Sequence, residues 1–138
     1  NKHGKVFVGQ RIDHVQAWQM PQGGIDAGED IELAAKRELE EETGISNVEI
    51  LRVAEEKIRY DVPSPLVENL WKGNFRGQEQ TWVAMRYLGD DSDIDLEFHH
   101  EPEFQAWQWV ELAETINLIV PFKRDVYKRV IQLFEDIA

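Results

Sequence analysis

The sequence predicts a mixed α/β fold, either an α+β arrangement or a three-layer α/β/α sandwich. Two segments have helical periodicity, at 30–44 and 123–137, and shorter segments of alternating or apolar residues lie before and between them. These segments do not alternate strictly between strand and helix, so a regular βαβ repeat is not expected. The chain has 138 residues, of which 42% are hydrophobic, and is predicted to form one domain over 1–138.

The N-terminal part is expected to contain one short strand and a loop. A turn over 2–5 leads into a weakly alternating segment at 5–9, which predicts the strand, and the residues 11–22 read as a loop. Trp18 and Met20 lie in this loop. Because large apolar side chains are mostly buried, both are expected to pack in the core.

The first helix is expected between Asp30 and Gly44. Asp30 is a suitable N-cap, and Gly44 lies where a C-cap glycine is typical. Between them Ile31, Ala35 and Leu39 repeat at helical spacing. This helix therefore has clear start and stop signals in the sequence.

The remaining elements are one long strand, two shorter strands and a final helix. Strands are expected over 48–60, 81–88 and 106–110, with a proline-containing loop at 61–76 and an acidic, solvated turn at 89–95. The final helix, 123–137, is amphipathic. Its inward side chains are expected to be Val126, Val130, Ile131, Phe134 and Ile137.

Three glutamates on the first helix form a candidate metal site. Glu38, Glu41 and Glu42 are spaced i, i+3 and i+4, so their carboxylates share one face, where each like-charge pair costs a few tenths of a kcal/mol, roughly. They also lie near the negative end of the helix dipole. A hard cation such as Mg²⁺ or Mn²⁺, which takes oxygen ligands, would turn this repulsion into attraction. The alternative is a solvated acidic face, the usual role of a charge run.

Composition excludes several classes of protein. The chain has no cysteine, which excludes disulfides and cysteine-ligated metal centres, and no apolar run approaches the roughly 20 residues of a membrane span. The net charge of −12 argues against DNA as a binding partner and against a surface that binds nucleic acids in general. We expect a cytoplasmic protein, monomeric and without a membrane partner, that can still bind polyphosphates through cations.

The segment 23–45 carries a longer pattern that resembles the Nudix box. It contains Gly23, Glu29, Arg37-Glu38-Leu39, Glu41-Glu42 and Gly44-Ile45 at the spacing of that motif. The resemblance implies the Nudix fold, a three-layer α/β/α sandwich with a mixed sheet. Family members usually have a further strand before the one expected at 5–9. Either this strand has been removed from the chain, or the sheet has a ragged edge.

The resemblance also implies roles for the residues of the box. Glu38, Glu41 and Glu42 would be the catalytic metal ligands, and one of them, or a base elsewhere, would activate the attacking water. Arg37 and Glu29 would form a structural ion pair that orients the helix. Gly23 and Gly44 would be structural positions of the motif.

Motifs outside the box resemble the bacterial RNA pyrophosphohydrolases, also called (di)nucleoside polyphosphate hydrolases, and the plant-type diadenosine tetraphosphate hydrolases. They are Trp18–Gly24, Ile58–Tyr60, Gly77–Trp82, Pro102–Phe104, Trp107–Val110 and Phe122–Tyr127. This resemblance implies that Glu103 is a further metal ligand. It also implies substrate contacts by Gln22, Tyr60, Phe122 and Lys123.

Aromatic and basic side chains in these motifs are candidates for substrate binding. Phe122 and Tyr60 could stack on a base, although Tyr60 fits the core equally well. The basic residues that could hold phosphates, or could be ordinary surface charges, are Lys123, Arg124, Arg59 and Arg11. RNA-decapping members often carry an extra arginine before the box, whereas here Arg11 is followed by Ile12.

The four histidines receive no role from the sequence. His99 and His100 would face opposite sides of a strand and lack a third nitrogen or sulfur ligand nearby, so a structural zinc site is not expected. His99 or His100 could still lie near the site, beside Glu103. The other two are His3 and His14.

The function expected from these motifs is that of a metal-dependent pyrophosphohydrolase. Its substrate would be a nucleotide polyphosphate or an RNA 5′ end: diadenosine tetraphosphate would give ATP and AMP, and triphosphorylated RNA would give the monophosphate. One alternative is a Nudix hydrolase of another nucleoside diphosphate derivative, and another is a non-catalytic nucleotide sensor. The intact set of adjacent carboxylates disfavours the sensor, since a sensor has no need of them.

Overall fold

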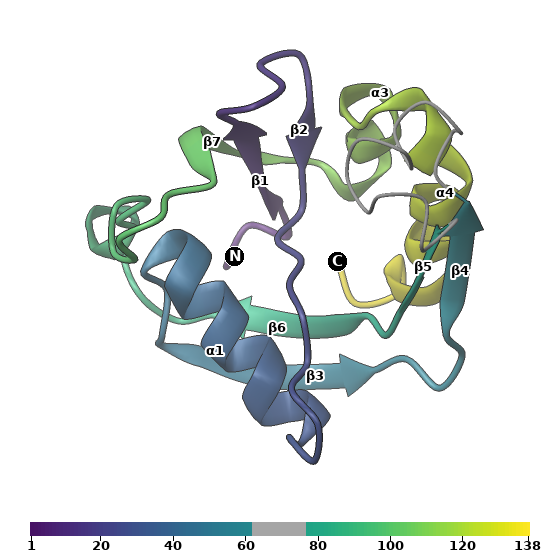
Figure 1. Cartoon of the computed structure of the whole chain (residues 1–138), viewed down its shortest axis with the longest axis horizontal. Coiled ribbons are helices and arrows are strands. Elements are labelled where there is room, and N and C mark those ends of the chain that lie inside the picture. The colour runs from purple at the N-terminus through teal and green to yellow at the C-terminus, as the bar shows by residue number, and fades with distance from the viewer. Residues whose placement is uncertain (62–76) are drawn as a thin grey trace.

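The fold was analysed in a computed structural model that describes residues 1–61 and 77–138 (Figure 1). The described strands are β1 (Val6–Arg11), β2 (Trp18–Gln19), β3 (Val48–Val53), β4 (Ile58–Asp61), β5 (Gly77–Gln80), β6 (Val83–Tyr87) and β7 (Phe104–Val110). The helices are α1 (Ile31–Thr43), α3 (Thr115–Leu118) and α4 (Arg124–Phe134). Short 3₁₀ turns cover Asp91–Asp93, Leu112–Glu114 and Pro121–Lys123. The mixture of helices and strands confirms the predicted fold class.

The described strands pair in three small antiparallel sheets. Their orders are β2-β1-β7, β3-β6 and β4-β5. Figure 1 shows α1 beside the β3-β6 pair and α4 beside the β4-β5 pair. A mixed sheet would contain both parallel and antiparallel strand pairs. Among the described residues all strand pairs are antiparallel, so the parallel pairs of the expected mixed sheet are not found there.

Helix α1 begins and ends as its sequence predicts. The Asp30 side chain accepts hydrogen bonds from the backbone N–H groups of Glu32 and Leu33, which caps the N-terminus. Gly44 has a positive φ of 73° and donates its N–H to the carbonyl of Glu40. A residue with a side chain is strained at this φ, so the glycine is suited to ending the helix.

The core has two clusters, and α4 contributes most to the larger one. Val126, Val130 and Phe134 are buried there together with Tyr127, while Ile131 and Ile137 are partly buried against the same cluster. The second cluster contains Phe7, Ile45, Tyr87 and Phe104. As predicted, Met20 is buried and Trp18 packs against the larger cluster.

Several element boundaries differ from the sequence predictions. The strand expected over 48–60 is broken into β3 and β4 by bends at Glu55 and Glu56, where two consecutive acidic residues lie in solvent. The loop expected over 11–22 contains β2, and β5, α3 and the 3₁₀ turns were not expected. The loop expected over 61–76 lies, from residue 62 onward, outside the described residues. None of the described helices is long and apolar enough to cross a membrane.

Candidate active site

Arg37 holds the start of the segment 23–45 against helix α1. Its guanidinium donates to both carboxylate oxygens of Glu29, at 2.8 and 2.9 Å, and to the carbonyl of Gly24 at 3.0 Å. The Glu29 carboxylate accepts hydrogen bonds from Arg37 and from the backbone N–H of Asp26, and these bonds lower its pKa to about 2. The expected pair of Arg37 and Glu29 is therefore present, and it fixes the loop that precedes the helix.

The same arginine also contacts two of the candidate metal ligands. One terminal nitrogen of Arg37 lies 2.9 Å from the Glu38 carboxylate and 3.4 Å from that of Glu41. Among the described residues no three acidic or histidine side chains already form a coordination group. Because Arg37 already contacts Glu38 and Glu41, a cation at this site would compete with Arg37 for both carboxylates.

At Gly23 the loop lies against Glu38, one of the candidate metal ligands. A Cβ atom at Gly23 would lie 2.0 Å from a carboxylate oxygen of Glu38, whereas a Cβ at Gly24 would meet no atom of the described residues within 4 Å. Only a residue without a side chain leaves Glu38 in its place. The two adjacent glycines thus have different roles.

Glu42 is a buried acid without a compensating partner. Only 5% of its surface is exposed, and neither carboxylate oxygen has a hydrogen-bond partner within the described parts of the chain. Burial, with a smaller contribution from the nearby Glu103, raises the pKa of Glu42 to about 10. A buried carboxylate without a hydrogen-bond partner is costly, so this position fits a bound cation.

Glu42 opens into a small carboxylate pocket of about 80 Å³. The pocket is lined by Glu38, Glu41, Glu42, His99, Glu101 and Glu103. Oxygen donors of this kind are those that Mg²⁺ and Mn²⁺ take. The residues therefore fit a divalent cation, and Glu103 lies at the same pocket although it comes from a distant part of the sequence.

A second cluster of polar and aromatic side chains contains the four expected substrate contacts. The Gln22 side-chain oxygen accepts hydrogen bonds from Lys123 at 3.2 Å and from Gln80 at 3.1 Å. The rings of Tyr60 and Phe122 lie 6.2 Å apart, and the Lys123 ammonium is 5.4 Å from the centre of the Tyr60 ring. Side chains from four separate elements thus meet at one place.

The basic residues are placed differently from one another. Lys123 is buried, which lowers the pKa of its ammonium to about 8, with a further contribution from Arg11. Arg11 is held by Asp13 and Gln19 and has only a third of its side chain exposed. Arg59, which pairs with Glu79, and Arg124 are exposed to solvent. Of the basic residues considered, Lys123 is therefore the one best placed in this cluster.

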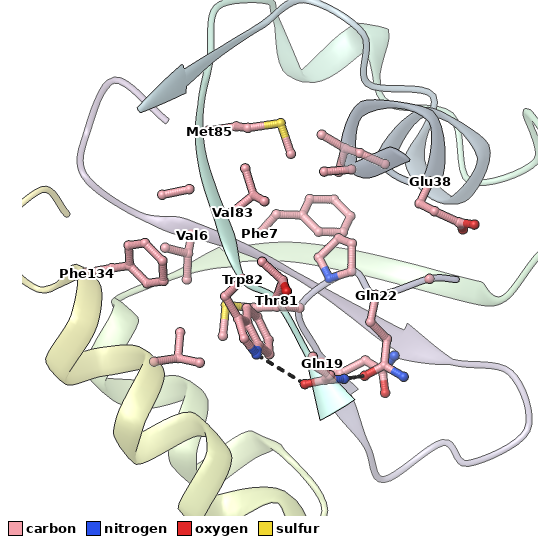
Figure 2. A pocket seen from close by; sticks show the side chains of 18 of the residues that line it. Val6, Phe7, Gln19, Gln22, Glu38, Thr81, Trp82, Val83, Met85 and Phe134 are labelled. Carbon is pink, nitrogen blue, oxygen red and sulfur yellow. Dashed lines mark hydrogen bonds between the residues drawn. The ribbon is translucent and has the colours of Figure 1, made fainter. Parts of the chain in front are cut away.

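A cavity of about 1750 Å³ connects the carboxylate pocket with the cluster formed by Gln22, Tyr60, Phe122 and Lys123. Figure 2 shows Gln22 and Glu38 at its polar side, and Val6, Met85 and Phe134 around its apolar part. Glu38 and Glu103 line both this cavity and the carboxylate pocket, so the two spaces adjoin. A chain of phosphates could extend from the carboxylates to Lys123, with a base near Tyr60 and Phe122.

Comparison with known proteins identifies the family. The NUDIX domain matches residues 1–130 of this chain. The chain belongs to the Nudix family. It is 54% identical over 137 residues to a Sphingopyxis alaskensis protein named RNA pyrophosphohydrolase, and the match covers 97% of this chain and 86% of that protein.

Solved structures of Nudix proteins have the same fold. The E. coli dihydroneopterin triphosphate pyrophosphohydrolase gives a TM-score of 0.71 at 19% identity, covering 94% of this chain and 86% of that one. The C. elegans Ap4A hydrolase in a binary complex gives 0.62 at 20% identity, covering 96% and 89%. At these identities the similarity concerns the fold alone, and it agrees with the Nudix fold predicted from the box.

The sequence assigned no role to several residues that the structure places at this site. Gln78 accepts a hydrogen bond from the Tyr60 hydroxyl at 2.7 Å, and Gln80 holds Gln22. Both residues lie in the Gly77–Trp82 motif that carries the family resemblance, but neither was given a role from the sequence. His99 and Glu101 line the carboxylate pocket, and no spacing rule linked either of them to the Nudix box.

Proposed function

We propose that this chain is a divalent-cation-dependent pyrophosphohydrolase, working as a single domain, that acts on nucleotides with three or more consecutive phosphates. The observation that carries this proposal is the orphaned Glu42 in a pocket of carboxylates that adjoins a cavity with Lys123 at its polar side. Nudix hydrolases generally use divalent cations, and here Mg²⁺ or Mn²⁺ would be held by Glu38, Glu41, Glu42 and Glu103. The bound cation would neutralise phosphate charge at the bond that breaks.

The reaction adds water across one phosphoric anhydride bond. Triphosphorylated RNA and water give RNA with a 5′-monophosphate and pyrophosphate, so atoms and charges balance without a further reactant. A carboxylate of the pocket would take the proton from the attacking water. Lys123 and Gln22 would hold the phosphate chain, and the Phe122 and Tyr60 rings would contact the first base.

The acidic surface limits how RNA can be bound. With a net charge of −12, the chain cannot hold a long RNA along its backbone, because such binding needs many Lys and Arg side chains. Recognition should therefore concentrate on the 5′ phosphates and the first one or two bases. The name of the Sphingopyxis alaskensis relative supports RNA as the substrate.

Diadenosine tetraphosphate is a second candidate substrate, because it also joins a nucleoside to a run of phosphates. The cavity of about 1750 Å³ has room for such a ligand. We expect asymmetric hydrolysis to ATP and AMP. The test is a product analysis of triphosphorylated RNA, diadenosine tetraphosphate and a nucleotide sugar. Cleavage of the nucleotide sugar at an equal rate, or ADP as the sole product of the tetraphosphate, would contradict the proposal.

Substitution of Glu103 should change the cation requirement of the reaction. Removing one of several carboxylate ligands in Glu103→Ala is expected to raise the half-saturating Mg²⁺ concentration about tenfold or more, with a smaller effect on kcat at saturating Mn²⁺. Metal titrations of the initial rate measure this shift. Glu97→Ala, an exposed acid on the same loop, is the control. An unchanged titration curve for Glu103→Ala would make Glu103 an ordinary surface acid.

Substrate affinity should fall at alkaline pH because Lys123 loses its charge. Burial lowers the pKa of Lys123 to about 8, so the ammonium that attracts phosphate is lost as the pH rises through that value. Phosphate groups are already ionised there, with a second pKa of about 6. KM should therefore rise with pH in the wild type.

Two variants isolate the contribution of Lys123 to this pH dependence. Lys123→Gln should have a high KM that is nearly independent of pH, and Arg124→Gln, a change of an exposed neighbour, should follow the wild type. The measurement is KM as a function of pH for all three proteins. A KM in Lys123→Gln that still rises through pH 8 would show that another group titrates.

A further inference from the structure

We propose that His99 donates a hydrogen bond from its Nε2 to a phosphate of the bound substrate, at the end of the phosphate chain farther from the base. This inference rests on the proposed function and adds one residue to its site. Of the described residues that line the carboxylate pocket, His99 is the one whose side chain is not an acid. The neighbouring His100 is exposed and does not line this pocket.

The loop that carries His99 is fixed at both ends beside the carboxylates. At one end the Asp95 N–H donates to the carbonyl of Thr43, the last residue of α1, at 2.8 Å. At the other end the carbonyl of Glu103 accepts from the Ile12 N–H, at 3.0 Å, before β7 begins. These anchors keep the half-buried His99 against the end of α1 that carries Glu41 and Glu42.

The local hydrogen bonding of His99 determines which nitrogen can donate. Nδ1 of His99 accepts a hydrogen bond from the backbone N–H of Glu101, at 3.4 Å. A nitrogen that accepts must carry a lone pair, so in the neutral ring the proton is on Nε2. A protonated Nε2 has no lone pair for a cation but can donate to an oxygen. The geometry therefore favours a role toward phosphate over one as a metal ligand.

Among the described residues, the rest of the pocket has no donor that could take this role. The other side chains that line it are carboxylates, which only accept hydrogen bonds when ionised. The guanidinium of Arg37 is engaged by Glu29, Glu38 and the carbonyl of Gly24, and that of Arg11 is engaged by Asp13 and Gln19. Phosphate oxygens that enter beside the cation need donors, since carboxylates repel them. His99 supplies such a donor through its Nε2.

The position of His99 also fixes which phosphate it would contact. Lys123, Tyr60 and Phe122 line the cavity but not the carboxylate pocket, whereas His99 lines the pocket but not the cavity, and Glu38 and Glu103 line both. A substrate with its base near Phe122 would bring the far phosphates to His99. His99 would thus help to recognise the pyrophosphate part of the substrate.

The test measures binding of inorganic pyrophosphate in the presence of Mg²⁺ by calorimetry, and binding of Mn²⁺ alone by electron paramagnetic resonance. His99→Ala should weaken pyrophosphate binding about tenfold, the effect of one hydrogen bond to a charged group, and leave Mn²⁺ affinity unchanged. His99→Gln should retain most of the affinity, because its amide nitrogen can replace Nε2. His3→Ala, a change of an exposed histidine that does not line this pocket, is the matched control and should bind as the wild type does.

Three outcomes would overturn the inference. Wild-type pyrophosphate affinity in His99→Ala would show that His99 makes no such contact. A parallel loss of Mn²⁺ binding would make His99 a metal ligand instead. A wild-type protein that binds neither Mn²⁺ nor pyrophosphate would contradict the proposed function as well, so the two failures are distinguishable.

Discussion

Replacement of Glu42 by Gln is expected to lower kcat by about two to four orders of magnitude. The reason is that a bound cation lowers the activation barrier of phosphoryl chemistry by several kcal/mol, and the variant lacks one of the ligands that hold the cation. The change is isosteric and removes a carboxylate that is 5% exposed and has no hydrogen-bond partner in the described structure. Folding should therefore be retained, and the cation-free variant should melt at the same temperature as the cation-free wild type or above it. Steady-state kinetics with Mg²⁺ and thermal melts by circular dichroism measure both effects.

A neighbouring glutamate provides the control for Glu42→Gln. Glu40 lies on the same turn of α1 and does not line the carboxylate pocket, so Glu40→Gln makes the same substitution without removing a ligand. Its kcat should remain within about twofold of the wild type, as for a surface substitution. Full activity of Glu42→Gln with Mg²⁺ would show that Glu42 does not bind the cation.

The second large effect is expected from Gly23→Ala. A Cβ at this position would lie 2.0 Å from a Glu38 carboxylate oxygen and 2.5 Å from its Cγ, so the Glu38 side chain must move. Because that side chain is flexible, the fold should survive while Glu38 is displaced. Activity should fall about tenfold to hundredfold, the range measured when the support of a metal ligand is removed.

Gly24→Ala is the matched control for Gly23→Ala. No atom of the described residues lies within 4 Å of its added Cβ, so activity and melting temperature should follow the wild type. Values of kcat/KM and melting curves for the two variants make the comparison. Equal activities of the two variants would mean that Glu38 works equally well from another position.

The local signals in the sequence predicted the first half of the site. Asp30 and Gly44 mark the ends of α1, and the i, i+3, i+4 spacing places Glu38, Glu41 and Glu42 on one face. These features depend on interactions between residues close in sequence. For that reason they could be predicted with no knowledge of how the rest of the chain packs.

The rest of the site depends on contacts between distant residues. Glu103 reaches the carboxylate pocket because β7 pairs with β1, and Gln22 meets Gln80 and Lys123 because three elements pack together. The resemblance to known proteins indicated these residues, but no spacing rule did. The sequence prediction joined β3 and β4 into one strand, although the charged run Glu55–Lys57 interrupts the alternation between them. His99 was left unassigned because its position depends on loop anchors at both ends.

The central claim is that this site hydrolyses a polyphosphate in a cation-dependent way. The most direct measurement is mass spectrometry of the products of a 5′-triphosphorylated oligonucleotide incubated with the protein and Mg²⁺ in ¹⁸O-water. We expect a 5′-monophosphorylated oligonucleotide and pyrophosphate, one solvent oxygen for each bond cleaved, and no product when the cation is chelated. An oligonucleotide that keeps its 5′-triphosphate with Mg²⁺ or Mn²⁺ present would contradict the account.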